Sequence, residues 1–123
     1  METRPYVSWD LMNSFLIDAF KGYGVPEDDA KICADVLLES DRRGIESHGC
    51  NRFKPIYIDR IVNGTLLPET KMDIVKDTPT TVVMDANNGM GMVASYHMME
   101  MLIEKAAKYG MAGGAVYNST HYG

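Results

Sequence analysis

One short segment contains the residue types and the spacing needed to hold a small 2-oxo acid. It runs from Asp41 to Arg52 and reads DRRGIESHGCNR. If it is helical or nearly so, His48 and Arg52 share a face, because side chains four residues apart lie about 5–6 Å apart at Cβ. The Arg52 guanidinium can then bind a carboxylate through two parallel hydrogen bonds, while His48 reaches the adjacent carbonyl oxygen. Ser47 can orient the imidazole and select its tautomer. The alternative is a surface loop without a chemical role.

A second polar cluster, Asn118-Ser119-Thr120-His121-Tyr122, directly follows an expected strand. Ligand sites of α/β sheets gather at the carboxyl ends of strands, so this cluster with His121 is a second candidate site. A single histidine after a strand can equally be structural. Two histidine-containing polar loops in one small chain favour convergence on a common site.

A glycine pattern, GMGMVA at residues 89–94, follows an expected strand and opens an expected helix. A dinucleotide fingerprint needs its glycines in the turn directly after a buried strand, and an acidic residue at the end of the next strand. Here residues 85–88 intervene, and the next strand ends in Tyr117 and Asn118. We therefore interpret Gly89 and Gly91 as helix-start and packing glycines.

Two further patterns are given structural interpretations. His97 and Glu100 can share a helix face, but no further ligand pattern accompanies them, so no metal site is expected. The methionines at positions 90, 92, 98, 99 and 101 are interpreted as pliable packing side chains.

The composition excludes several classes of protein. Of 123 residues, 46% are apolar and 24% are charged, which is typical of a soluble globular domain. The formal net charge is -5 without any run of Lys or Arg, so nucleic acid is not an expected partner. No stretch has the length of a membrane span or the apolar core of a signal peptide, so no membrane contact is expected. Cys33 and Cys50 are expected to be reduced thiols, which favours a cytoplasmic location.

The N-terminal half is expected to be helical. Apolar spacing predicts one helix from the N-cap Ser8 to residues 22–24 and a second from Pro26 to about Gly44. In the first helix the apolar residues that recur at helical spacing are Leu11, Phe15, Leu16 and Ala19. The buried stripe of the second is expected to be Ala30, Cys33, Ala34, Leu37 and Leu38. A loop over 44–49 precedes a third helix over 51–63, in which Pro55 is tolerated in the first turn or as a kink. Tyr57 lies off the Arg52 face of an ideal helix and reaches the site only through such a bend.

The C-terminal half is expected to be α/β. Strands are predicted over 71–76 and 80–85, a helix over 92–109 capped by Gly110, and a strand over 112–118. The fold class is therefore α/β, with a helical N-terminal segment (1–70) that carries the Ser-His-Gly motif, and the beginning of an α/β body (71–123). Because the chain stops directly after a polar cluster, it is expected to be truncated.

These segments resemble the N-terminal signature of the malate/L-lactate dehydrogenase family, which also includes ureidoglycolate, sulfolactate and cyclic-imine-carboxylate oxidoreductases. The matching segments are residues 41–49, Arg52, 57–61, 87–91, 103–106 and 118–123, in this order. Tyr122 stands where Phe is common, and Tyr57 stands one residue further from Arg52 than in several members.

The resemblance implies roles for four residues of the helical segment. His48 would donate a proton to the substrate carbonyl, and Ser47 would complete a relay with it. Arg52 would anchor the substrate carboxylate, and Tyr57 would contact the substrate.

For the C-terminal cluster the resemblance implies that Thr120 and His121 contact a nicotinamide cofactor, NAD or NADP, with His121 as the second candidate for the acid–base group. The expected function is hydride transfer between this cofactor and a small 2-hydroxy or 2-oxo acid of malate or lactate type. A mixed-sheet, non-Rossmann fold and a homodimer are implied as well, and this stretch alone is not expected to be active. The alternative is a non-catalytic helical module for interaction or oligomerisation.

Overall fold

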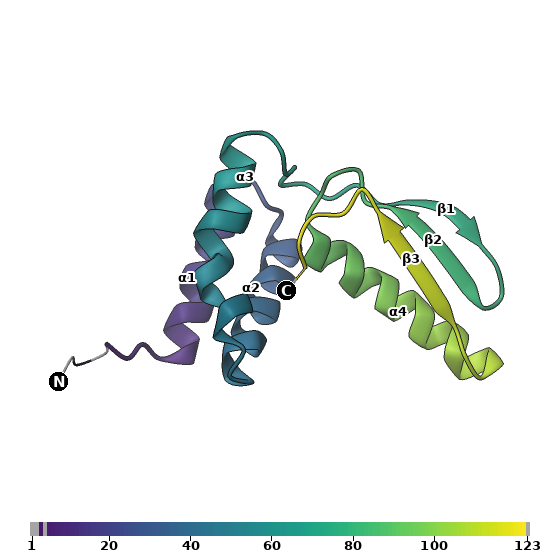
Figure 1. Cartoon of the computed structure of the whole chain (residues 1–123), viewed down its shortest axis with the longest axis horizontal. Coiled ribbons are helices and arrows are strands. Elements are labelled where there is room, and N and C mark those ends of the chain that lie inside the picture. Colours follow the sequence, from purple (N-terminus) through teal and green to yellow (C-terminus); the bar gives the residue numbers. More distant parts are fainter. Residues whose placement is uncertain (1–2, 4, 123) are drawn as a thin grey trace.

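The computed structural model describes residue 3 and residues 5–122 of the chain. Helices α1 (Trp9–Gly22) and α2 (Glu27–Arg42) form a hairpin, and a three-stranded sheet with helix α4 (Gly91–Tyr109) on one face lies beside it (Figure 1). This arrangement confirms the predicted α/β class, with a helical part followed by a mixed sheet.

The helical hairpin follows the predicted boundaries closely. The Ser8 hydroxyl caps α1 by accepting a hydrogen bond from the backbone N–H of Leu11, at 3.2 Å. Gly24 turns the chain with a φ of +94°, a left-handed conformation that glycine adopts without steric cost. Pro26 directly precedes α2, where its missing N–H costs no helical hydrogen bond.

The two helices differ in how many of their apolar residues are buried. All five residues predicted for α2 are at most 1% exposed. In α1 the buried residues are Leu16 and Phe20, whereas Leu11 and Phe15, which recur at the same helical spacing as Leu16, are 63% and 56% exposed. A surface helix buries only one stripe, and the apolar residues of α1 extend around more of the helix than α2 can cover.

The segment after α2 is helical but irregular. It contains two 3₁₀ turns, η1 (Glu46–His48) and η2 (Cys50–Arg52), a π-helix, η3 (Phe53–Ile58), and the short helix α3 (Asp59–Val62). The predicted loop over 44–49 therefore contains a helical turn, and the predicted third helix changes its type along its length. Pro55 lacks the N–H that would continue an α-helical ladder, which accounts for the irregularity at this point.

The sheet is mixed. Strands β1 (Asp73–Asp77) and β2 (Thr81–Asp85) are antiparallel, with a register shift between Ile74 and Lys76. Strand β3 (Gly113–Tyr117) pairs with β2 in parallel after the crossover through α4, which gives the order β1-β2-β3. As a result the carboxyl ends of β2 and β3 lie at the same edge of the sheet.

The beginning of α4 connects the two halves of the molecule. Met90, Met92 and Val93 belong to the core of the helical hairpin, whereas Ala94 and Met98 belong to the core under the sheet. The same few residues thus fix the position of the sheet relative to the hairpin. No helix within the described residues is long and apolar enough to cross a membrane.

Candidate active site

The Ser-His-Gly turn is held by a residue that sequence reasoning did not select. The Asp41 carboxylate, at the end of α2, accepts a hydrogen bond from the backbone N–H of Cys50 at 2.9 Å. A Cβ atom on Gly49 would overlap this carboxylate, so the turn can close over Asp41 only with glycine at that position. The one signal in the sequence is the position of Asp41 at the start of the motif-bearing segment.

Ser47, His48 and Arg52 meet on this turn as predicted. The Ser47 hydroxyl and His48 Nδ1 form a hydrogen bond of 2.8 Å. Arg52 Nε donates to the Ser47 carbonyl oxygen, so the arginine packs against the turn that carries His48. A guanidinium and an imidazole are thereby held within one short segment, which is an arrangement suited to an anion with an adjacent polar oxygen.

The π-helix brings Tyr57 into the same region. In an ideal α-helix a side chain five positions along is rotated by about 140° from the first. A π-helix is closed by i to i+5 hydrogen bonds, so residues five apart lie nearly above one another. Tyr57 is fully buried and contacts Phe20 edge to face, with ring centroids 6.2 Å apart. The bend that the prediction required is therefore present as a wide turn.

His121 reaches this group from the far end of the chain. Its Nδ1 forms a hydrogen bond of 2.9 Å with the Tyr57 hydroxyl, and its ring is stacked on His48 at 5.6 Å between centroids and 23° between planes. Burial lowers the pKa of His121 below its ordinary value, and the charges of His48, Arg52 and Arg60 lower it further. The two histidine loops thus converge, as the sequence analysis anticipated.

Thr120 anchors the backbone beside His121. Its hydroxyl donates to the Gly89 carbonyl at 2.9 Å and accepts from the Gly91 N–H at 3.0 Å. The Met90 N–H donates to the Thr70 hydroxyl at 2.9 Å. The N–H groups of Met90 and Gly91, at the start of α4, are therefore bonded to protein hydroxyls, which agrees with interpreting the glycines as packing residues.

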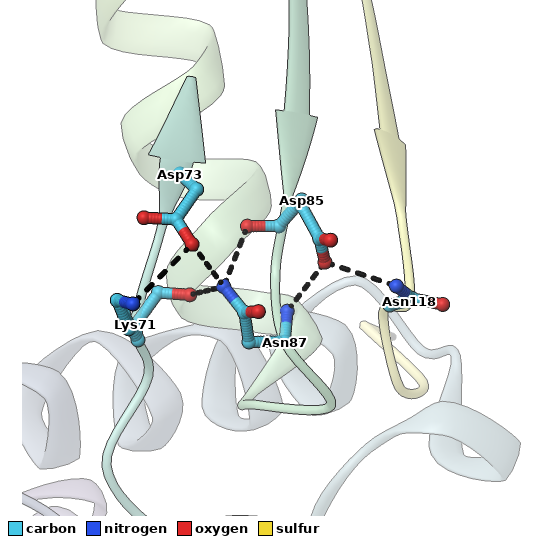
Figure 2. A network of polar contacts seen from close by, with 5 residues as sticks. All are labelled: Lys71, Asp73, Asp85, Asn87 and Asn118. Atoms are coloured by element: carbon cyan, nitrogen blue, oxygen red, sulfur yellow. Dashed lines mark hydrogen bonds and ion pairs between the residues drawn. The ribbon is translucent and has the colours of Figure 1, made fainter. Parts of the chain in front are cut away.

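The chain leaves β3 toward the site through a polar network that sequence reasoning also missed (Figure 2). The Asp85 carboxylate, at the end of β2, accepts hydrogen bonds from the Asn87 N–H at 2.8 Å and from Asn118 Nδ2 at 3.1 Å. Asn87 Nδ2 donates to the Lys71 carbonyl and to Asp73, both at 3.0 Å. The hydrogen bonds from the Asn87 N–H and from Asn118 lower the pKa of Asp85. The network joins the ends of three strands and fixes where residues 119–121 begin.

Two asparagines in this network adopt a conformation that few other residues accept. Asn87 and Asn118 both have a φ of +49°, in the left-handed region where asparagine is enriched. Asparagines at or just after the ends of predicted strands were the available signal for these turns.

Other polar groups have structural surroundings. His97 pairs with Glu100 at 2.9 Å, and within the described residues no group of three or more potential ligands is arranged to hold a metal ion. Burial raises the pKa of the Cys50 thiol to about 12, and the hydrogen bond to Asp41 contributes. Cys33 is buried and both cysteines are free thiols.

Comparison with known proteins identifies a matching family and several similar proteins. Residues 7–123 match the family model described as malate/L-lactate dehydrogenase. The malate dehydrogenase of Pyrococcus abyssi is 42% identical over 93% of this chain and 31% of its own length, and the L-sulfolactate dehydrogenase of Methanocaldococcus jannaschii is 43% identical over 88% and 31%. The crystal structure of malate dehydrogenase from Entamoeba histolytica superposes on 98% of this chain and 34% of its own, with 43% identity and a TM-score of 0.95. The chain thus spans about a third of the length of these relatives.

Proposed function

This chain belongs to the malate/L-lactate dehydrogenase family, and we propose that it supplies the substrate-holding and proton-transferring residues of a 2-hydroxyacid oxidoreductase. The observation that carries the proposal is the stack of His48 on His121 beside Arg52. Chain segments distant in sequence contribute these groups, and Arg52 lies close enough to His121 to lower its pKa. The substrate class is a small 2-hydroxy or 2-oxo acid of malate or lactate type.

In the proposed reaction Arg52 binds the substrate carboxylate through its planar fork of N–H donors. His48, oriented by Ser47, gives its proton to the keto oxygen as the carbonyl is reduced, and neutral His48 then regains a proton from water. NAD or NADP, when bound in its reduced form, supplies the hydride that adds to the carbonyl carbon.

The residues of this chain fit only one end of such a cofactor. The His48–His121 stack, with Thr120 fixing the adjacent backbone, offers a polar surface for the nicotinamide ring. At the glycine-rich start of α4, the hydroxyls of Thr70 and Thr120 already accept the N–H groups of Met90 and Gly91, so these two groups are not available to bind the cofactor phosphates. The cofactor roles of His121 and Thr120 are accordingly proposed for the nicotinamide end.

A chimaera provides the test. Residues 1–123 would replace the corresponding third of the Pyrococcus abyssi relative, and oxidation of NADH and NADPH would be followed with oxaloacetate, pyruvate and other 2-oxo acids. We expect turnover of at least one 2-oxo acid. In parallel, the 123-residue chain would be titrated with oxaloacetate while the Arg52 Nε–H signal is followed by NMR. A folded chimaera without activity, together with an unperturbed Arg52 signal, would contradict the proposal.

Self-association is a second candidate function, favoured by the exposed apolar side of α1. Leu11 and Phe15, four residues apart on one side of this helix, are 63% and 56% exposed. We propose that this side contacts a second copy of the chain to form a homodimer. Sedimentation velocity would then give a dimer for the wild type and a monomer for Phe15→Glu, whereas a wild-type monomer at all concentrations tested would exclude the homodimer.

A further inference from the structure

We propose that Tyr57 is a positioning residue that fixes the tautomer of His121, so that the neutral ring carries its proton on Nε2. The catalytic meaning of this inference rests on the proposed function. The tautomer itself is a property of the chain and can be measured without any substrate or cofactor.

The Tyr57 hydroxyl has to donate a hydrogen bond. The side chain is fully buried, and burial raises the pKa of the phenol, so it keeps its proton at neutral pH. A buried O–H without an acceptor is costly, and buried polar groups are therefore almost always paired. Among the described residues, the acceptor within reach is Nδ1 of His121, at 2.9 Å.

His121 is in a position to accept because its ring is surrounded by positive or potentially positive groups. His48 is stacked on it, and Arg52 and Arg60 are close enough to lower its pKa, in addition to the effect of burial. The ring is therefore neutral near pH 7, and a neutral imidazole has one N–H and one bare nitrogen. With Tyr57 donating to Nδ1, the proton resides on Nε2.

Both members of the pair are held by the backbone. The π-helix sets the direction of Tyr57, and Thr120, bonded to Gly89 and Gly91, sets the position of the residue next to it. The hydrogen bond thus joins two independently anchored segments, which is the arrangement required of a positioning contact.

The fixed tautomer gives His121 and His48 different roles in the proposed reaction. A neutral ring with its proton on Nε2 can donate a hydrogen bond to the keto oxygen and so stabilise the negative charge that develops there, while keeping its proton. The proton that ends on the product oxygen then comes from His48. His121 is, in this inference, an electrophilic group and His48 the acid.

The test is a long-range proton–nitrogen NMR correlation of the histidine rings in the 15N-labelled 123-residue chain near pH 7. The chain contains three histidines, which would be assigned with His48→Gln, His97→Gln and His121→Gln. We expect an unprotonated Nδ1, which accepts the Tyr57 hydrogen bond, and a protonated Nε2 for His121. In Tyr57→Phe, which keeps the ring and its packing but lacks the hydroxyl, the two nitrogen shifts of His121 should move toward each other as both tautomers become populated.

Tyr23→Phe is the matched control, because Tyr23 is 45% exposed at the end of α1 and the same atom is removed there. Its His121 signals should equal those of the wild type. A protonated Nδ1 in the wild type, or unchanged shifts in Tyr57→Phe, would overturn the inference. The wild-type measurement decides the tautomer even if the phenylalanine variant is poorly folded. A confirmed tautomer in a chain whose chimaera is inactive counts against the proposed function alone.

Discussion

Gly91 and Thr120 are interlocked at the start of α4. The Thr120 hydroxyl accepts the Gly91 N–H at 3.0 Å, and a Cβ atom on Gly91 would overlap the Thr120 carbonyl oxygen. The loop that carries His121 therefore lies directly against Gly91, where α4 has no side chain to keep the two backbones apart.

This contact predicts that Gly91→Ala destabilises the chain. The added methyl group must displace the backbone of Thr120 and His121, and overpacking of this kind costs about 1–3 kcal/mol. Urea denaturation would measure the change in the free energy of unfolding. Gly22→Ala is the matched helical control, because nothing lies within 4 Å of its Cβ position, and it should be neutral or stabilising by about 0.5–1 kcal/mol. Equal effects of the two substitutions would contradict the interlocked packing.

His48→Ala should lower the turnover of the active chimaera by about two to four orders of magnitude, because it removes the proton donor. His121→Ala should lower it by about two to three orders of magnitude, as expected for loss of one donor to the developing oxyanion. Steady-state kinetics with a saturating 2-oxo acid would measure both. If His48→Ala keeps most of the activity, the role of proton donor passes to His121.

Arg52→Lys should mainly weaken substrate binding. A lysine ammonium is a point charge and cannot reproduce the two-pronged hydrogen bonding of a guanidinium, so we expect KM to rise about tenfold to a hundredfold. Arg43→Lys is the control, since Arg43 is an exposed residue that pairs with Glu39 at the surface of α2. An unchanged KM and turnover in Arg52→Lys would remove Arg52 from the site.

The environment of His121 predicts a pH dependence of stability. Its pKa is lower in the folded chain than the ordinary value of about 6.5, so the unfolded chain binds the proton more readily. The contribution of neutral His121 to the free energy of unfolding is present above about pH 6.5. It is lost as the pH falls through the pKa that His121 has in the folded chain. We expect His121→Gln to lose less stability than the wild type between about pH 7 and pH 5. Urea titrations at several pH values would measure this, and parallel losses would show that His121 makes no such contribution.

Cys50 should react slowly with alkylating reagents. Burial raises the pKa of its thiol to about 12, with a further increase from Asp41, so little thiolate is present at pH 8. We expect labelling by iodoacetamide about tenfold to a hundredfold slower than that of an exposed thiol. Asp41→Asn removes the negative charge and should accelerate labelling at Cys50, followed by peptide mass spectrometry. An unaltered rate would argue against the pairing of Asp41 with this turn.

The sequence predicted those elements that depend on local pattern. The α2 stripe could be identified because Ala30, Cys33, Ala34, Leu37 and Leu38 recur at helical spacing, and all five are buried. In α1 the apolar residues extend around the helix, so spacing alone could not separate Leu16, which is buried, from Phe15, which is exposed. Local pattern gives the period of a helix, but the direction of its buried face depends on what it packs against.

In the site, too, local sequence pattern predicts some contacts, whereas others depend on the tertiary fold. Ser47, His48 and Arg52 are close in sequence, and their grouping could be predicted from spacing. The contact of Tyr57 with His121 joins residues 64 positions apart and depends on the crossover through α4, which no local pattern specifies. Asp41 was missed because its role is to accept a backbone N–H, and nothing in its immediate neighbours marks that partner.

The wide turn at Phe53–Ile58 also bears on how motif spacing is compared between proteins. When a helix accommodates one additional residue in a single wide turn, the residues after that turn keep the direction around the helix axis that they would have without the insertion. A tyrosine five positions after an arginine can then occupy the direction that a tyrosine four positions after it has in a regular helix. Counting along the chain would report a shifted residue where three-dimensional alignment finds an equivalent one.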